Sequence, residues 1–306
     1  MATGRIFTDF RNSFMSKDIV MRLILINCLV FVFMGLIRVF MTLFNVPLSY
    51  NPISEALSLH AWLPTLMRQP WSIVTYMFMH GGVFHLLFNM LWLYWFGKLF
   101  LNYFSSKHLR GLYILGGLCG GLLYIISYNI FPYFELARIQ ATMVGASASV
   151  LAIVVATAVR QPEMPVQFLF IGSVRLKYVA LFIIVIDLML MTSDNAGGHI
   201  AHLGGAISGY WFAAGLAKGH DATKYINNVI DFIDKLFSGR LNLFSRKQQK
   251  PKMKVHYGER QQQYDYNARK KANEDEINQI LEKLRKSGYS SLSEEEKKKL
   301  FDASRR

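Results

Sequence analysis

The chain has 306 residues, of which 52% are hydrophobic and only 18% are charged. Soluble domains carry roughly 25% charged residues, so this composition argues against an ordinary soluble enzyme and favours a membrane protein with a modest appendage. The formal net charge is +14. The two cysteines, Cys28 and Cys119, both lie in apolar runs, so we expect no disulfide framework.

Six apolar segments are candidates for membrane-spanning helices, each of which needs about 20 residues. They cover about Met21–Phe44, Gly81–Phe104, Leu109–Phe131, Ala141–Val159, Tyr178–Thr192 and Gly198–Ala217. The fifth segment is short and contains an acidic residue, Asp187. The N-terminus shows no cleavable signal, so we expect the first span to serve as the targeting signal.

The distribution of Lys and Arg predicts the orientation, because these residues concentrate in cytoplasmic connections. One side has Arg5, Arg11, Lys17, Lys98, Lys107, Arg110, Arg160, Arg175 and Lys177, and the other has Arg68 and Arg138. Both termini are therefore expected in the cytoplasm, which requires an even number of spans. The long loop Asn45–Pro70 mixes apolar and polar residues and is expected to lie at the membrane interface.

Residues 218–306 differ in composition from the rest of the chain. They contain 21 of the 34 Lys and Arg residues and 13 of the 20 Asp and Glu residues. Helical periodicity predicts amphipathic helices over Asp221–Leu236 and Asn273–Lys286, and Ser291–Glu294 resembles a capping box that opens a last short helix. The basic residues alternate with acidic ones, so we expect contacts with anionic lipid or a protein rather than with nucleic acid.

Polar residues within spans are costly, and three clusters of them need an explanation. In the second span, His85 and Asn89 are four residues apart and share one helix face, with His80 just before it. Imidazole and amide groups donate hydrogen bonds, so this pair is able to stabilise a developing oxyanion. Alternatively, the pair forms hydrogen bonds that join neighbouring helices.

The fourth span contains Ser147 and Ser149 among small residues, in the sequence Gly145-Ala146-Ser147-Ala148-Ser149. Small residues in a span usually permit close helix packing. They also give a neighbouring helix access to a serine nucleophile, which is the functional interpretation. Two residues along a helix turn a side chain by roughly 200°, so only one of the two serines can face a common site.

The sixth span contains His199 and His202, one turn apart, followed by a GxxxG pattern at Gly205 and Gly209. A histidine opposite a serine can accept the serine proton and return it to a leaving amine. A metal site is the alternative, but no well-placed carboxylate or cysteine is expected to complete a ligand set. The sequence therefore predicts no metal and no organic cofactor.

Together, these clusters supply a nucleophile, a base and paired donors on three different spans. The chain thereby resembles the rhomboid family of intramembrane serine proteases. The family has a histidine and an asparagine four apart on its second span, G-x-S-G or G-x-S-A on its fourth, and A-H followed by glycines on its sixth. The matching residues here are His85 and Asn89, Gly145-Ala146-Ser147-Ala148 and Ala201-His202-Leu203-Gly204-Gly205.

The resemblance covers about residues 20–217 and implies a role for each matching residue. Ser147 is then the nucleophile and His202 the general base, in a dyad without the orienting carboxylate of a triad. His85 and Asn89, with the Ser147 backbone N–H, form the oxyanion site. His80, Gly145 and His199 support the site.

Two positions depart from the family pattern. The family often has Trp-Arg before the second span, where this chain has Trp71 followed by Ser72. The anchoring of the first loop is therefore expected to differ. The family often has an aromatic residue four positions after the serine, where this chain has Leu151, so we expect aliphatic packing against His202.

We therefore expect an all-α membrane protein, a six-transmembrane-helix rhomboid-like bundle with a small helical soluble tail. Residues 1–20 form a cytoplasmic segment, 21–217 the catalytic bundle and 218–306 the basic tail. The resemblance implies a serine endopeptidase in the membrane, expected to be a bacterial inner membrane, that cleaves transmembrane protein substrates in or near their spans. Two alternatives are a catalytically inactive rhomboid-like protein that binds clients and a transporter or channel with its histidines as a proton path.

Overall fold

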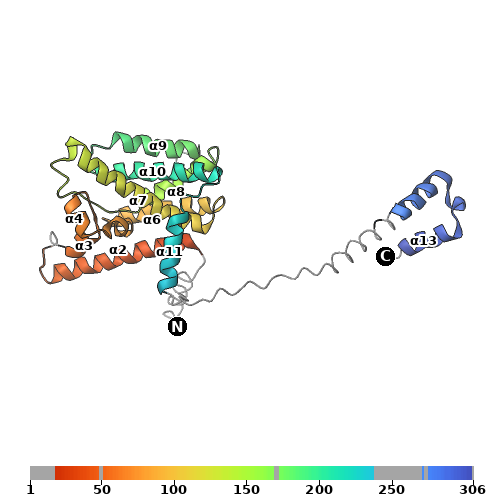
Figure 1. Ribbon diagram of the computed structural model, residues 1–306, viewed down its shortest axis with the longest axis horizontal. Coiled ribbons are helices and arrows are strands. Elements are labelled where there is room, and N and C mark those ends of the chain that lie inside the picture. The colour runs from red at the N-terminus through yellow and green to blue at the C-terminus, as the bar shows by residue number, and fades with distance from the viewer. Residues whose placement is uncertain (1–17, 48–50, 169–171, 238–270, 272–274, 305–306) are drawn as a thin grey trace. The chain divides into compact units, whose positions relative to one another are not determined.

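The computed structural model describes residues 18–47, 51–168, 172–237, 271 and 275–304. Six helices lie at the positions of the six predicted spans (Figure 1): α2 (Ile19–Leu43), α6 (Val83–Leu101), α7 (Ser106–Ile130), α8 (Ser147–Arg160), α9 (Leu176–Met189) and α10 (Ala196–Ala217). By length and composition, α2, α6 and α7 are able to cross a membrane, and α8 is a shorter apolar helix. The chain is a mostly helical membrane protein.

Short elements connect these helices. They are α3 (Pro52–Leu57), β1 (Leu59–His60), α4 (Leu63–Arg68), α5 (Ser72–Thr75), η1 (Tyr76–Phe78), η2 (Pro132–Phe134), β2 (Thr142–Met143), β3 (Pro165–Phe168) and β4 (Gly172–Arg175). Strands β3 and β4 form an antiparallel hairpin between α8 and α9, with Val166 opposite Val174. Glu163 pairs with Lys177 and with Arg175, which fixes the base of this hairpin to the start of α9.

Helix α8 packs against α7 and α10 through small residues that allow the backbones to touch. A Cβ atom at Gly205 would overlap the carbonyl oxygen of Ala148, and one at Gly209 would overlap that of Ala152. From α7, a Cβ atom at Gly116 would lie 2.6 Å from the Ala152 Cβ. The prediction that Gly205 and Gly209 permit tight packing is therefore confirmed.

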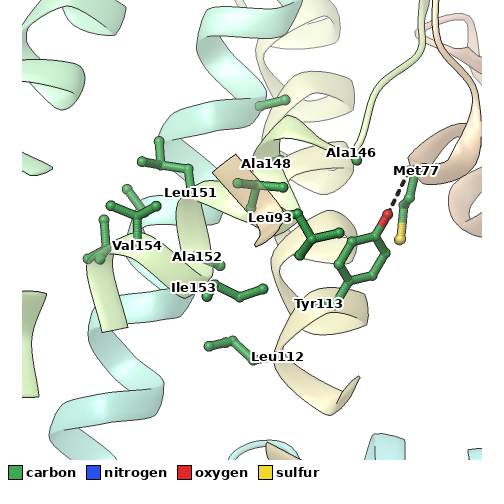
Figure 2. Close-up of a cluster of buried hydrophobic side chains, with 14 of the residues drawn as sticks. Met77, Leu93, Leu112, Tyr113, Ala146, Ala148, Leu151, Ala152, Ile153 and Val154 are labelled. Carbon is green, nitrogen blue, oxygen red and sulfur yellow. Dashed lines mark hydrogen bonds between the residues drawn. The ribbon is translucent and has the colours of Figure 1, made fainter. Parts of the chain in front are cut away.

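Buried apolar side chains fill the space around this three-helix contact (Figure 2). Tyr113 is fully buried among them and uses its hydroxyl to donate a hydrogen bond to the Met77 carbonyl at 3.0 Å. The buried Asn27 amide of α2 donates to the same hydroxyl at 3.1 Å. Since an unpaired polar group in this environment would be costly, these bonds join α2 and η1 to α7 specifically.

The chain before α8 is extended rather than helical, so the predicted start of the fourth span at Ala141 is wrong. Strand β2 pairs antiparallel with β1, with Leu59 opposite Met143. The Gly145 N–H then donates to the Tyr76 carbonyl at 3.0 Å. Gly145 has φ of +145°, a conformation that side chains other than glycine rarely adopt, and this turn starts the helix at Ser147 instead.

The segment after α2 is held in place by hydrogen bonds from neighbouring elements. The Trp71 indole donates to the Ala56 carbonyl and the Thr75 hydroxyl to the Leu57 carbonyl, each at 2.8 Å. The Asn129 amide of α7 donates to the Ala61 carbonyl at 2.8 Å. Although Ser72 replaces the arginine of the family pattern, the segment is anchored by these bonds.

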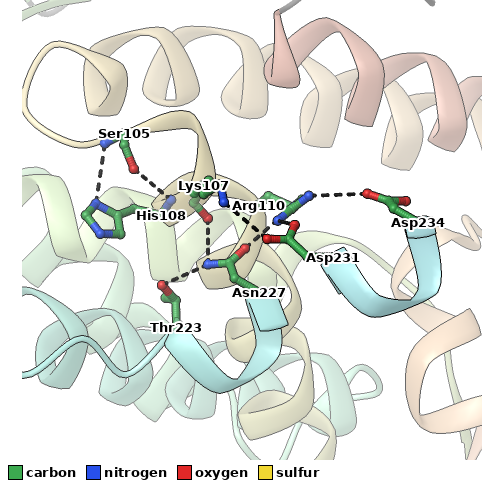
Figure 3. Close-up of polar contacts among 8 residues, drawn as sticks. All are labelled: Ser105, Lys107, His108, Arg110, Thr223, Asn227, Asp231 and Asp234. Atoms are coloured by element: carbon green, nitrogen blue, oxygen red, sulfur yellow. Dashed lines mark hydrogen bonds and ion pairs between the residues drawn. The ribbon is translucent and has the colours of Figure 1, made fainter. Parts of the chain in front are cut away.

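Helix α11 (Lys224–Phe237) lies in the tail but packs on the N-terminal end of α7 (Figure 3). Arg110 pairs with Asp231 at 2.6 Å, and Lys107 pairs with Asp231 at 3.1 Å. The hydrogen bond and charge of Arg110, reinforced by Lys107, hold the pKa of the Asp231 carboxyl below its ordinary value. The buried Asn227 amide donates to the Lys107 carbonyl at 3.0 Å and to the Thr223 hydroxyl at 3.2 Å.

The compact unit that contains the bundle extends to Leu241 and therefore includes α11, whereas residues 242–306 form a second unit. Within the second unit, residues 275–287 are helical and α13 spans Glu294–Ser304. The capping box lies at Ser293 and Glu296, two residues after the predicted position. The Glu296 N–H donates to the Ser293 hydroxyl, and the Ser293 N–H donates to the Glu296 carboxylate.

Gly111 of α7 faces α11 with no room for a side chain, and we predict that Gly111→Leu displaces α11. A Cβ atom there would lie 2.6 Å from both Asn227 Nδ2 and Thr223 Cβ. Hydrogen exchange over residues 224–237 should become faster by at least about tenfold, since the docked helix loses its partner. Gly35→Leu in α2 is the matched control, because a Cβ atom at Gly35 has no atom within 4 Å. Unchanged exchange in Gly111→Leu would contradict the docked arrangement.

Candidate active site

Ser147 occupies the first turn of α8, directly after the Gly145–Ala146 turn. The first hydrogen bond along this helix is donated by Val150 to the Ala146 carbonyl. The preceding N–H groups, including that of Ser147, have no partner within the helix and carry its positive dipole end. The Ser147 hydroxyl thus lies beside backbone donors that are suited to bind a negative charge.

Ser149 faces a different direction from Ser147. It is fully buried, and the close contact of its Cα with Gly116 places it on the side of α8 that faces α7. The Ser147 hydroxyl instead lies near Gly145, on the side where His85 is found. The predicted separation of the two serines is therefore confirmed.

His85 and Asn89 lie on α6 and face the Ser147 turn. A Cβ atom at Gly145 would lie 3.1 Å from His85 Nε2 and 3.5 Å from Ser147 Oγ, so the ring and the hydroxyl both border this glycine. The Asn89 side chain is nearly buried and donates one hydrogen bond to the His85 carbonyl at 2.9 Å. An amide NH₂ has two donors, so Asn89 retains a second one for another acceptor.

Ser147, Asn89 and His202 line a single cavity of about 200 Å³ between α6, α8, α9 and α10. The other lining residues are Phe88, Trp92, Val150, Leu151 and Ile183. The structure therefore brings together the residues that were predicted from three separate spans. It also places Leu151 in the same lining as His202, as the sequence led us to expect.

Asp187 lies on α9 and contacts both histidines of α10. His202 Nδ1 lies 2.9 Å from Asp187 Oδ1, and His199 Nδ1 lies 2.8 Å from the same oxygen. Asp187 is only 3% exposed, whereas the two imidazoles are partly accessible. The predicted absence of an orienting carboxylate is therefore wrong, because one lies within hydrogen-bond distance of the candidate base.

Residues 67–219, half of the chain, match the Rhomboid domain family. The chain belongs to the rhomboid family. The matched region begins near the end of α4 and ends after α10, and so contains every residue of the site just described. A separate match, to a family of unknown function (DUF6576), covers residues 263–306 of this rhomboid.

Several curated proteins are similar to this rhomboid. The mitochondrial RHOMBOID-like protein 12 of Arabidopsis thaliana is 28% identical over 145 residues, which cover 44% of this chain and 43% of the relative. Rhomboid-related protein 1 of Caenorhabditis elegans is 29% identical over 157 residues, 49% of this chain and 40% of the relative. This rhomboid thus spans less than half the length of these relatives. They are plant and nematode proteins, so they do not support the expected bacterial membrane.

The position of Asp187 in the fifth predicted span already marks it as a candidate functional residue. Asp187 is the acidic residue of the fifth predicted span, and an ionisable residue in a span is a functional candidate by default. Its contact with α10 depends on how two helices are rotated about their axes. Spacing along the chain does not determine this rotation, so the sequence could not pair Asp187 with His202.

The reason given against a metal site also needs correction, because a carboxylate does lie beside two histidines. One potential ligand atom from each of Asp187, His199 and His202 lies within 4.8 Å of the others. Zinc sites commonly use histidine and carboxylate ligands. The nitrogen-to-oxygen distances of 2.8 and 2.9 Å are nevertheless those of hydrogen bonds, in which Asp187 Oδ1 is shared by the two imidazoles.

The remaining predicted residues surround this centre. The ring of His80 contacts that of His85 edge to face, with 5.1 Å between centroids. His80 thus supports the His85 ring rather than bordering the cavity of Ser147. His199 lies one turn before His202 and shares its carboxylate partner.

We predict that Gly145→Ala disrupts the Ser147 turn. Gly145 has a φ of +145°, and an added methyl group would press on the His85 ring at 3.1 Å. Strain of this kind costs about 1–3 kcal/mol, so thermal unfolding in detergent should occur at lower temperature. Gly81→Ala is the control, because its nearest contacts would be at 4.0 Å. Equal melting temperatures for the two variants would show that Gly145 is not under this constraint.

Proposed function

We propose that this rhomboid is an intramembrane serine endopeptidase with Ser147 as the nucleophile and His202 as the general base. The observation that carries the proposal is the shared cavity, into which Ser147, His202 and Asn89 project from three helices. Membership of the rhomboid family agrees with this chemistry. The substrate is a transmembrane protein that is cut in or near its span, and neither a metal nor an organic cofactor takes part.

In the first half of the proposed reaction, His202 Nε2 takes the proton from the Ser147 hydroxyl as its oxygen attacks the scissile carbonyl carbon. The oxyanion that forms is stabilised by the Ser147 backbone N–H, His85 and Asn89. The imidazolium then gives its proton to the leaving amine. The C–N bond breaks, and an acyl ester remains on Ser147.

In the second half, water attacks the ester after His202 accepts one of its protons, and the proton returns to Ser147 as the acid product leaves. The partly exposed His202 ring borders the cavity, so water can reach it, and we propose that it enters from the outer face. A helical substrate hides its carbonyl groups in hydrogen bonds. We therefore expect substrates with small or helix-breaking residues near the outer membrane boundary.

The proposal includes a six-span topology with both termini in the cytoplasm. The basic connections and the helices at all six predicted positions support it. Helix α11 presents exposed apolar side chains at Tyr225, Val229, Phe232 and Leu236. We propose that this face lies among the headgroups of the inner leaflet, to which the basic tail is attracted by about 1 kcal/mol per basic residue near the surface.

We predict that Ser147→Ala abolishes cleavage of a transmembrane reporter and labelling by a fluorophosphonate probe, by at least about 10³-fold, because the nucleophile is lost. Ser149→Ala is the matched control and should retain both, since Ser149 is buried against α7. Both variants should unfold at temperatures close to that of the wild type. If wild-type protein binds transmembrane clients but is neither labelled nor active, the chain is a non-catalytic client binder instead.

We predict that truncation after Leu241 leaves Ser147 labelling within about twofold of wild type, because it removes only the second compact unit. Truncation after Lys218 also removes α11, and with it the partners of Arg110 and Lys107. The shorter protein should therefore melt earlier in detergent. Complete loss of labelling in the longer, folded truncation would show that the distal tail is part of the catalytic machinery.

A further inference from the structure

We propose that Asp187 is a positioning residue that fixes the tautomer and the orientation of His202, so that this rhomboid works with a carboxylate–histidine–serine relay rather than a bare dyad. This inference rests on the proposed function, because it assigns a task to Asp187 in that same reaction. It also makes a statement about the imidazole of His202 that is measurable without any substrate.

The geometry determines which nitrogen of His202 carries the proton. An ionised carboxylate only accepts hydrogen bonds, so with Asp187 ionised the contacts at 2.9 Å and 2.8 Å place an N–H at Nδ1 of both His202 and His199. Neutral His202 is then left with a lone pair on Nε2. That lone pair is what the base needs in order to accept the Ser147 proton.

Because Asp187 is buried, its contact with His202 is expected to stabilise the transition state more than the resting enzyme. Asp187 is 3% exposed, and its second oxygen, Oδ2, is buried without a hydrogen-bond partner in the described residues. Its charge is therefore incompletely balanced while both imidazoles are neutral. When His202 accepts the Ser147 proton, an imidazolium forms beside this carboxylate, and the ion pair stabilises the transition state selectively.

Helix packing keeps Asp187 in place. It lies on α9, while both histidines lie on α10, three residues apart on one face. The two bonds from α10 to a single oxygen define the rotation of α9 about its axis. The hydrogen bond to Asp187 thereby orients the His202 ring, while the apolar Leu151 lines the same cavity as His202.

Other ionisable groups near His202 will contribute to any pH dependence. They are His199 on its own helix, Asp187 on α9 and His85 on α6, which is close enough to interact electrostatically with His202. From α7 it is the Cys119 backbone that lies against Gly204, and α8 contributes Ser147 to the lining of the same cavity. The Asp187 carboxylate supplies the negative charge in this group.

The test compares wild type with Asp187→Asn, which keeps the shape and removes the charge. We expect kcat on a transmembrane reporter to fall by at least about 10²-fold with KM within about threefold, since substrate contacts are intact. The acidic limb of the kcat profile should move to lower pH, because imidazolium formation loses its carboxylate partner. Asp231→Asn is the matched control, since it removes a carboxylate that pairs with Arg110 near the N-terminal end of α7.

A second measurement does not depend on activity. In ¹⁵N-histidine NMR spectra, with the His202 signals assigned through His202→Gln, the wild type should show a proton on Nδ1 and a bare Nε2. The Asp187→Asn variant should lose this preference, because the Asn amide is able to donate as well as accept. Thermal unfolding in detergent shows whether Asp187→Asn has folded. If it has not, the Asp187→Glu variant restores the charge and should recover the Nδ1–H tautomer and part of kcat.

The outcomes separate the two proposals. A wild type that shows the Nδ1–H tautomer but cleaves nothing would refute the proposed function and leave the effect of Asp187 on the tautomer standing. An active wild type whose tautomer, kcat and pH profile are unchanged by Asp187→Asn would overturn the inference. Stoichiometric zinc in the purified protein, lost in Asp187→Asn, would also overturn it, because Asp187 would then be a metal ligand.

Discussion

The contact on which the site depends is the backbone-to-backbone packing of α8 against α10. Gly205 and Gly209 leave no room for a Cβ atom between α10 and the carbonyl groups of Ala148 and Ala152. Without a strong hydrophobic driving force in lipid, close contact of this kind is a principal source of helix association. Since His202 precedes Gly205 by three residues and Ser147 precedes Ala148 by one, the same contact sets the position of the base relative to the nucleophile.

A second constraint acts on the nucleophile from the opposite direction. The extended chain of β2, the Gly145 turn and the bond from the Gly145 N–H to the Tyr76 carbonyl fix where α8 begins. The serine therefore lies at a helix end rather than in the middle of a span. That position provides unpaired backbone N–H groups next to the hydroxyl, which an internal serine would lack.

Much of this arrangement could be predicted from the sequence. Apolar segments of sufficient length located all six helices, and the spacing of His85 to Asn89 placed that pair correctly on one face. The predicted start of the fourth span at Ala141 was wrong, because the apolar character of residues 141–146 also suits an extended chain. Hydropathy records how a residue partitions, and it does not distinguish a buried strand from a buried helix.

The contact of Asp187 with the two histidines could not be predicted from the sequence, for a different reason. Its partners are on another helix, and their alignment depends on a rotation that no local pattern encodes. The capping box of the second unit shows the same limit at short range. Both Ser291 and Ser293 are plausible N-caps by composition, and the choice follows from the reciprocal bonds of Ser293 with Glu296.

The glycine contact between α8 and α10 has a consequence for how this sequence can change over evolutionary time. At Gly205 and Gly209 the constraint is purely steric. Any other residue would place a Cβ atom on the backbone of α8, whatever the chemical character of its side chain. Ile207 and Trp211, on the exposed side of α10, are not subject to this steric limit. We therefore expect α10 to tolerate few substitutions on its glycine face and many on its exposed face.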